Sequence, residues 1–207
     1  MNTALLLAFI PTFFFVSITP GMCMTLALTL GMSIGYKRAL WMMLGELIGV
    51  AIVAISAVIG IAAVMLNYPW LFTGFKIVGA SYLFYLGIQM WLSRGKLAIN
   101  LDTMADVPSS NEWQLVVQGF VTAIANPKGW AFMISLLPPF IDNSHDLLPQ
   151  LTLLIGIILI SEFVCMTLYA TGGKGLKRVL GHSENVRLMN RIAGSLMMGV
   201  GIWLFLS

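Results

Sequence analysis

From Leu5 to Leu30 the chain reads LLLAFIPTFFFVSITPGMCMTLALTL, and none of these side chains is charged. At about 1.5 Å per residue, a helix of this length is long enough to cross the hydrocarbon core of a bilayer, which is about 30 Å thick. The run contains Pro20 and Gly21 near the middle of the uncharged stretch that ends at Lys37. Proline removes a backbone donor and clashes with the preceding turn. The stretch therefore predicts a membrane-spanning helix that is interrupted near the bilayer midplane.

Long apolar runs recur along the rest of the chain. Of its 207 residues, 59% are hydrophobic and only 9% are charged, whereas soluble domains carry about 25% charged residues. Five further apolar runs are Ala39–Leu66, Trp70–Leu92, Trp113–Ile141, Leu147–Thr171 and Ile192–Leu206. The last is short unless its helix begins near Val186. We predict an all-α integral membrane protein with six transmembrane helices. Because no Lys or Arg precedes Lys37, we expect the first run to be a span rather than a cleaved signal peptide.

Charged residues between the runs predict an orientation. The basic residues of the first, third and fifth loops and their flanks are Lys37, Arg38, Arg94, Lys96, Lys174, Lys177, Arg178, Arg187 and Arg191. The second and fourth loops contain none, although Lys76 lies just inside the third run. Since cytoplasmic loops collect Lys and Arg, we expect a multi-pass protein of the bacterial inner membrane with both termini on the periplasmic side. We read the small net charge of +3 as topology and not as a nucleic-acid surface.

The longest loop divides the chain nearly in half. We expect one transmembrane domain over residues 1–207, with a first three-helix repeat (1–93), a cytoplasmic linker (94–112) and a second repeat (113–207). Three spans are an odd number, so the second half must enter the membrane from the opposite side, which is the arrangement of inverted-repeat transporters.

Matching features occur in the two halves. Pro127 interrupts the fourth run as Pro20 interrupts the first, and the following runs hold Glu46 and Glu162. The sequence therefore predicts a 3+3 inverted repeat with interrupted helices 1 and 4. Ordinary proline kinks, which membrane helices tolerate, are the alternative.

Three charged residues, Glu46, Lys128 and Glu162, lie deep in apolar sequence. A charge at the membrane centre costs about 2.5–3.5 kcal/mol on the gentlest scale, so such residues usually face a cavity or a partner. One interpretation is a buried ion pair between Lys128 and a glutamate without further role. The other is a site for a zwitterion, in which Lys128 binds a carboxylate while a glutamate accepts an ammonium group or carries the coupling proton. Low dielectric favours the neutral form of carboxyl groups in general, which suits reversible protonation.

The candidate substrate-binding residues are those at the two interruptions and the two acids: Thr19, Pro20, Gly21, Asn126, Pro127, Lys128, Glu46 and Glu162. The proton-coupling candidates are Glu46 and Glu162. We interpret Cys23 and Cys165 as packing residues and expect neither a metal site nor a cofactor. Expected partners are an amino acid, protons and membrane lipid, and a homo-oligomer is compatible with the sequence.

These motifs, in this order, resemble the LysE/RhtB family of bacterial amino-acid exporters, within it the homoserine, threonine and leucine efflux branch. The resemblance covers nearly the whole chain and rests on Thr19-Pro20-Gly21, Gly45-Glu46, the run Gly79–Gly87, Asn126-Pro127-Lys128, the run Leu137–Asp142, and Gly194, Gly199 and Gly201. Two departures are Met22 where the family commonly has a second proline, and Glu46 where it commonly has aspartate. The resemblance implies proton-driven efflux of small or hydrophobic amino acids.

Other functions remain as alternatives at this point. An exporter or channel for another small solute, such as a cation, would share the same architecture. A membrane-embedded enzyme is disfavoured because we find no convincing nucleophile and base pair. The two histidines, His145 and His182, fall in loops expected on opposite sides of the membrane.

Overall fold

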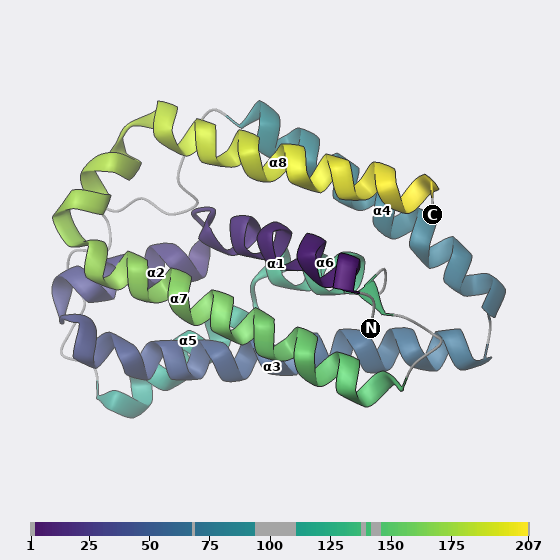
Figure 1. Cartoon of the computed structure of the whole chain (residues 1–207). Helices are drawn as coiled ribbons and strands as arrows, with labels where there is room; N and C mark the ends of the chain where they lie inside the picture. Colours follow the sequence, from purple (N-terminus) through teal and green to yellow (C-terminus); the bar gives the residue numbers. More distant parts are fainter. Residues whose placement is uncertain (1–2, 68, 94–110, 138–139, 142–145, 207) are drawn as a thin grey trace.

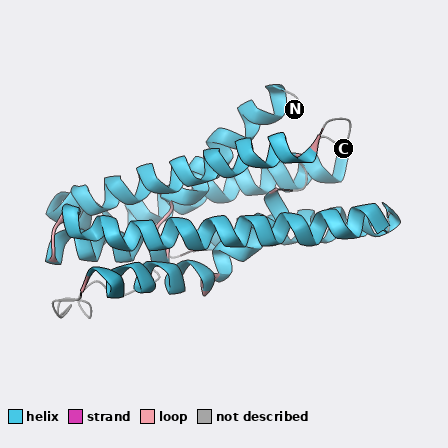
Figure 2. Cartoon of the chain, turned by 90° about the horizontal axis from the view of Figure 1, so that it is seen from below, coloured by secondary structure: helices cyan, strands magenta, loops and turns pink. Residues whose placement is uncertain are grey.

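The computed structural model describes residues 3–67, 69–93, 111–137, 140–141 and 146–206, and the regular structure within these ranges is helical (Figure 2). In chain order the helices are α1 (Thr3–Ile18), α2 (Met22–Ser33), α3 (Tyr36–Asn67), α4 (Pro69–Leu92), α5 (Glu112–Ile124), α6 (Pro127–Leu136), α7 (Leu147–Gly181) and α8 (Ser183–Leu206). In Figure 1, α4 and α8 pack together at the top, whereas α2, α3, α5 and α7 form a lower bundle. The short helices α1 and α6 lie between these two groups.

The interruptions predicted from sequence are present. The first run forms α1 and α2, which are separated at Thr19–Gly21 and bent by 56°. The fourth run forms α5 and α6, which are separated at Ala125 and Asn126. The other four runs correspond to α3, α4, α7 and α8. Helix α8 begins at Ser183, which gives the last run the extra length that it lacked.

Two described helical segments, Tyr36–Gly60 and Leu147–Gly173, are long and apolar enough to cross a membrane by themselves. The bent pair of α1 and α2 becomes a third span if it is counted as one. Helix α7 continues beyond the predicted end at Thr171. It changes direction at Gly173, whose φ of 49° lies in the left-handed region that glycine adopts without strain.

Close backbone packing between α3 and α5 determines where Glu46 points. A Cβ atom on Gly45 would lie 1.9 Å from the carbonyl oxygen of Val116, and one on Gly119 would lie 1.9 Å from that of Met42. Only glycine allows the two backbones to approach so closely. Glu46 follows Gly45 directly, and its side chain is 1% exposed.

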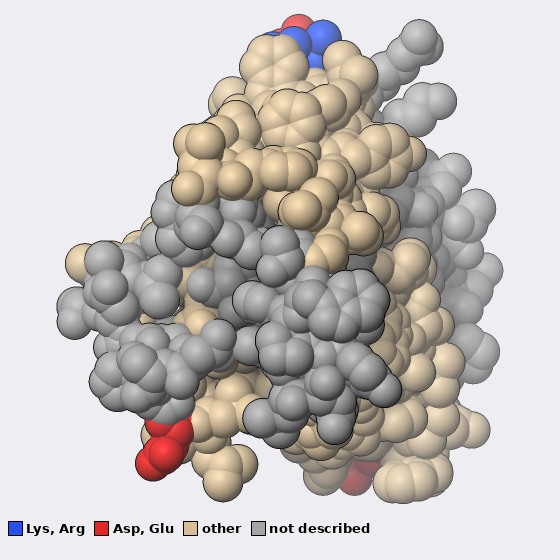
Figure 3. Space-filling model, turned by 90° about the vertical axis from the view of Figure 1, so that its right-hand side faces the viewer, with Lys and Arg blue, Asp and Glu red and all other residues tan. Residues whose placement is uncertain are grey.

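The outer surface is apolar along most of the described chain. Helix α3 exposes a stripe formed by Leu44, Ile48, Ile52, Ile55 and Ile59. Figure 3 shows the right-hand end of Figure 1, where the visible Lys and Arg side chains lie only at the upper edge. Soluble proteins rarely expose apolar patches of this extent, and a lipid-facing surface explains them.

Some sequence-based predictions fall outside the described residues. These are most of the linker (residues 94–110), residues 138–139 and residues 142–145 of the fourth loop, which include His145. The side chains of Lys76, Lys174 and Lys177 are also outside the described set. The orientation in the membrane, the division into repeats and the domain boundaries therefore stay predictions.

Candidate functional site

The interruption between α1 and α2 frees carbonyl groups that a continuous helix would have used. The last carbonyls of a helix have no intrahelical partner and must be satisfied otherwise. The ammonium of Lys128 donates to the carbonyl oxygens of Val16 and Thr19, at 2.8 and 3.3 Å. The hydroxyl of Tyr169 donates to the carbonyl oxygen of Ile18 at 2.7 Å. Side chains from α6 and α7 thus provide hydrogen-bond donors for the carbonyl groups at and beyond the end of α1.

The second interruption is a capped helix start. The Asn126 side chain accepts from the backbone N–H of Lys128 at 3.1 Å, and Pro127 occupies the first helical position, which suits it. Asn126 also donates to the sulfur of Cys23 at 3.6 Å, so α2 contacts this cap. Trp130 donates to the carbonyl oxygen of Ile124 at 2.8 Å and packs in the core. The hydrogen bonds of this interruption position Lys128 toward α1.

The two acids come from different helices and lie near each other. The hydroxyl of Ser17 donates to Oε1 of Glu162 at 2.8 Å. Glu162 interacts electrostatically with both Glu46 and Lys128. Within the described part of the chain, Lys128 donates to backbone carbonyls and makes no salt bridge to either acid. The simple buried ion pair is therefore not what the structure shows.

Glu46 has an unsatisfied oxygen. Its Oε2 atom is buried and has no hydrogen-bond partner among the described residues. An unpaired buried carboxylate oxygen is costly, because the low-dielectric interior does not replace the lost hydration. A proton, a water molecule or a ligand ammonium group would each satisfy it.

These groups surround one small cavity. Its volume is about 50 Å³, and its polar lining comes from Ser17, Thr19, Cys23, Glu46, Asn126, Lys128 and Glu162, with Gly21 among its other lining residues. A water molecule needs about 10–15 Å³ of such space. In this conformation, the cavity therefore has room for a few water molecules or protons rather than for an amino acid.

A larger chamber of about 410 Å³ lies beside it, between the interruptions and the α4–α8 pair. Pro20 and Pro127 line this chamber and not the small cavity. Thr19 and Lys128 line both. The eight candidate residues thus gather in one region but divide between two adjoining spaces.

Three residues that contribute to the candidate site were not predicted from the sequence. Ser17 could not be predicted as a site residue, because a serine in an apolar helix usually hydrogen-bonds to the backbone of its own helix. The residues around Ser17 in the sequence give no indication of its hydrogen bond to Glu162. Tyr169 could not be predicted, because the backbone carbonyl of Ile18 to which it donates has no signal in a sequence. Cys23 was interpreted as a packing residue; it is free and buried, but its sulfur also accepts from Asn126.

The arrangement can bind small charged groups and exchange protons. One cation and two acids from three helices line one small cavity, and both helix interruptions border it. Within the described residues, no group of His, Cys, Asp and Glu side chains could hold a metal ion. Binding and release of a polar solute is the chemistry that these groups support.

Comparison with known proteins agrees with this chemistry. The sequence profile described as "LysE type translocator" matches residues 14–207. The chain is 30% identical over 205 residues to an uncharacterized membrane protein of Vibrio cholerae, covering 99% of this chain and 98% of that protein. It is 29% identical to a homoserine/homoserine lactone efflux protein of Salmonella typhimurium (94% and 92% covered) and 28% identical to a leucine efflux protein of an Enterobacter species (90% and 88%). No solved structure matches the chain.

Proposed function

Because the chain belongs to the LysE type translocator family, and related chains are named as efflux proteins, we propose that it exports small or hydrophobic amino acids by exchange with protons. The exporter works in the bacterial inner membrane. Candidate substrates are homoserine, threonine and leucine, two of which appear in the names of relatives. No cofactor is required, because the proton gradient supplies the energy.

One observation carries the proposal. Lys128, Glu46 and Glu162 come from α6, α3 and α7, yet all three line the cavity at which both helix interruptions meet. Buried charges inside a membrane are costly and are typically retained for substrate or proton pathways. Lys128 offers a cation for a substrate carboxylate, and the two acids offer sites for a proton or an ammonium group.

The proposed architecture is the 3+3 inverted repeat, with six spans, both termini periplasmic and the linker 94–112 cytoplasmic. The first repeat would contain α1 to α4 and the second α5 to α8. Interrupted helices at matching positions of two such halves are typical of secondary transporters, whose substrate lies at the repeat interface. Rocking of one group of helices against the other would then expose the site to each side in turn.

Transport into inside-out membrane vesicles tests this function. Vesicles containing the protein are given radiolabelled L-homoserine, L-threonine or L-leucine while the interior is acidified. A proton-coupled exporter accumulates the amino acid above the external concentration, and a protonophore abolishes the accumulation. Equilibration without accumulation would indicate a channel, and absence of flux for all three amino acids would contradict the proposed substrate class.

The orientation has its own test. In a variant without Cys23 and Cys165, single cysteines are introduced as Asp146→Cys or Ser183→Cys, both at exposed positions. We expect a membrane-impermeant thiol reagent to label Asp146→Cys in intact cells with a permeabilised outer membrane, and Ser183→Cys only in inside-out vesicles. The reverse labelling would invert the topology.

A further inference from the structure

Two adjoining spaces with different chemistry lie beside the helix interruptions. The small cavity contains both acids, whereas the chamber is lined by α4, α8 and the two prolines. We propose that the transported amino acid binds in the chamber, with its carboxylate at Lys128 and its side chain against α4 and α8, while the small cavity is reserved for protons. This assignment rests on the proposed function, because it names where the exported substrate sits.

Size is the first argument. Ligand sites in proteins usually occupy about 300–1,000 Å³. The chamber, at about 410 Å³, falls within this range, and the small cavity, at about 50 Å³, does not. For an amino acid to bind among Glu46 and Glu162, the surrounding helices would have to move apart first.

Charge is the second argument. Lys128 is the one charged side chain among the described residues that line the chamber. Its ammonium has three N–H groups, of which two donate to the carbonyls of Val16 and Thr19. No described residue accepts from the third N–H, which is left for a ligand carboxylate. A carboxylate entering the chamber meets a cation there and avoids repulsion from the two acids behind it.

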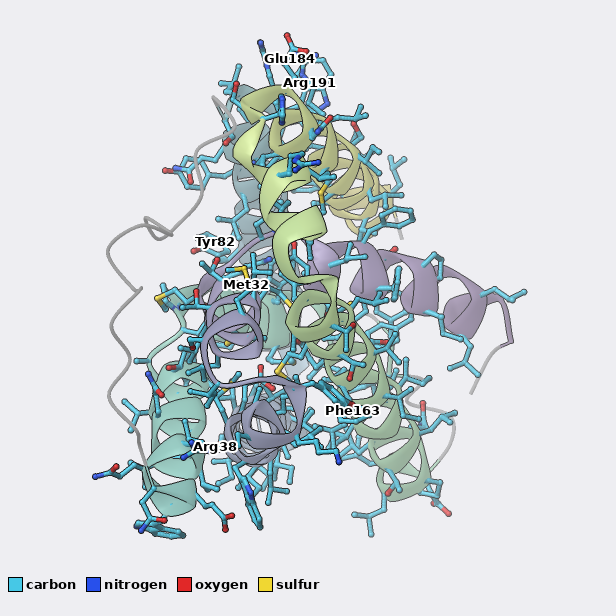
Figure 4. All side chains as sticks on the ribbon, turned by 90° about the vertical axis from the view of Figure 1, so that its left-hand side faces the viewer. Met32, Arg38, Tyr82, Phe163, Glu184 and Arg191 are labelled. Carbon is cyan, nitrogen blue, oxygen red and sulfur yellow. The ribbon has the colours of Figure 1, made fainter. Side chains whose placement is uncertain are left out.

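The lining of α4 and α8 provides the remaining contacts. Gln89 and Asn190 contribute amide oxygens that can accept from a substrate ammonium group, and Leu86, Met90 and Met197 form an apolar wall. Tyr82 of α4, which is labelled in Figure 4, also lines the chamber. A polar end and an apolar wall suit an amino acid with a short or branched aliphatic side chain.

The chamber also lies where an exporter must load. Its lining includes Ser93 and Asn190, which hydrogen-bond to each other at 3.0 Å. Both residues adjoin the segments with the most basic residues, which the proposed topology places in the cytoplasm. The chamber is therefore the loading site on the cytoplasmic side, and α4 and α8 determine which side chains are accepted.

Filling the chamber tests the assignment. Leu86→Trp places a larger ring on the apolar wall, and Ile88→Trp on the outward, exposed side of α4 is the matched control. In vesicle transport we expect Leu86→Trp to raise the KM for L-leucine at least tenfold, with a smaller rise for L-homoserine, whereas Ile88→Trp leaves both unchanged. Equal KM values in Leu86→Trp and the control would overturn the assignment.

A second variant covers the case in which Leu86→Trp does not fold. Gln89→Ala removes one hydrogen bond to the charged ammonium group of the substrate and should raise KM about 10- to 140-fold for both amino acids. Gln118→Ala on α5, outside the chamber, should not. If the wild-type protein transports none of L-homoserine, L-threonine and L-leucine, the proposed function fails. If it transports any of them and Gln89→Ala behaves like Gln118→Ala with that amino acid, only the chamber assignment fails.

Discussion

Replacement of Lys128 by alanine separates function from stability most clearly. The substitution removes two charge-assisted hydrogen bonds, to the carbonyl oxygens of Val16 and Thr19. Each such bond contributes about 1.5–3 kcal/mol, so the loss amounts to about 3–6 kcal/mol. It also removes a charge that costs about 2.5–3.5 kcal/mol near the membrane centre. The net destabilisation is therefore between about −0.5 and 3.5 kcal/mol, less than the stability of a typical protein.

We accordingly expect Lys128→Ala to fold, insert and give a symmetric size-exclusion peak, with a modestly lower thermal midpoint. Transport should fall by about 10- to 140-fold or to background, because the substrate carboxylate loses a charged hydrogen bond of about 1.5–3 kcal/mol. Lys37→Ala, which removes an exposed lysine from the start of α3, serves as the control for lost positive charge and should transport normally.

Two results would refute this reasoning. Full transport by Lys128→Ala would show that the lysine has no role in substrate binding. Aggregation of Lys128→Ala, with Lys37→Ala soluble and folded, would show that Lys128 mainly holds α1 and α6 together. The free energy of the two lost hydrogen bonds would then exceed the cost of the removed charge by more than we expect.

Two further perturbations test the acids and the helix packing. Glu46→Gln and Glu162→Gln keep the shape of each side chain but cannot exchange a proton, so the transport rate of at least one should lose its dependence on pH; if both keep the wild-type profile, proton coupling lies elsewhere. Gly45→Ala forces a Cβ to within 1.9 Å of the Val116 carbonyl oxygen and should destabilise the protein by about 1–3 kcal/mol or more, measured as a lower thermal midpoint. A Cβ on Gly60 of the same helix would meet no atom within 4 Å, so Gly60→Ala should leave the thermal midpoint unchanged or raise it. Equal midpoints for Gly45→Ala and Gly60→Ala would contradict the close α3–α5 contact.

Much of the helix layout could be predicted from sequence because membrane spans follow from simple length and composition rules. The interruption at Pro20 and Gly21 could be located because proline and glycine act locally. The continuation of α7 past Thr171 could not, because it depends on Gly173 taking a left-handed conformation after the apolar run has ended. A hydropathy pattern contains no signal for that choice.

The candidate site was predictable in its charged residues but not in their contacts. Glu46, Lys128 and Glu162 stand out because charges are rare in apolar sequence. Their partners are backbone carbonyls and a serine, which no residue pattern distinguishes. The division into a small acidic cavity and a larger chamber depends on how α4 and α8 pack against the interruptions, and this is a tertiary property.

The two interruptions also explain each other. In the proposed inverted repeat, Pro20 corresponds to Pro127, and Gly21 therefore corresponds to Lys128. A Cβ on Gly21 would lie 3.7 Å from the Lys128 ammonium nitrogen, so the lysine side chain packs against Gly21. Gly21 has no side chain and therefore leaves room for the side chain of Lys128. The Lys128 ammonium group in turn donates to the backbone carbonyls that the first interruption frees. Any movement that separates α1 from α6 must break those hydrogen bonds. In the proposed exporter, the substrate carboxylate binds the remaining N–H of the same ammonium group. Substrate binding and separation of α1 from α6 would then both act on Lys128, which would link the two events.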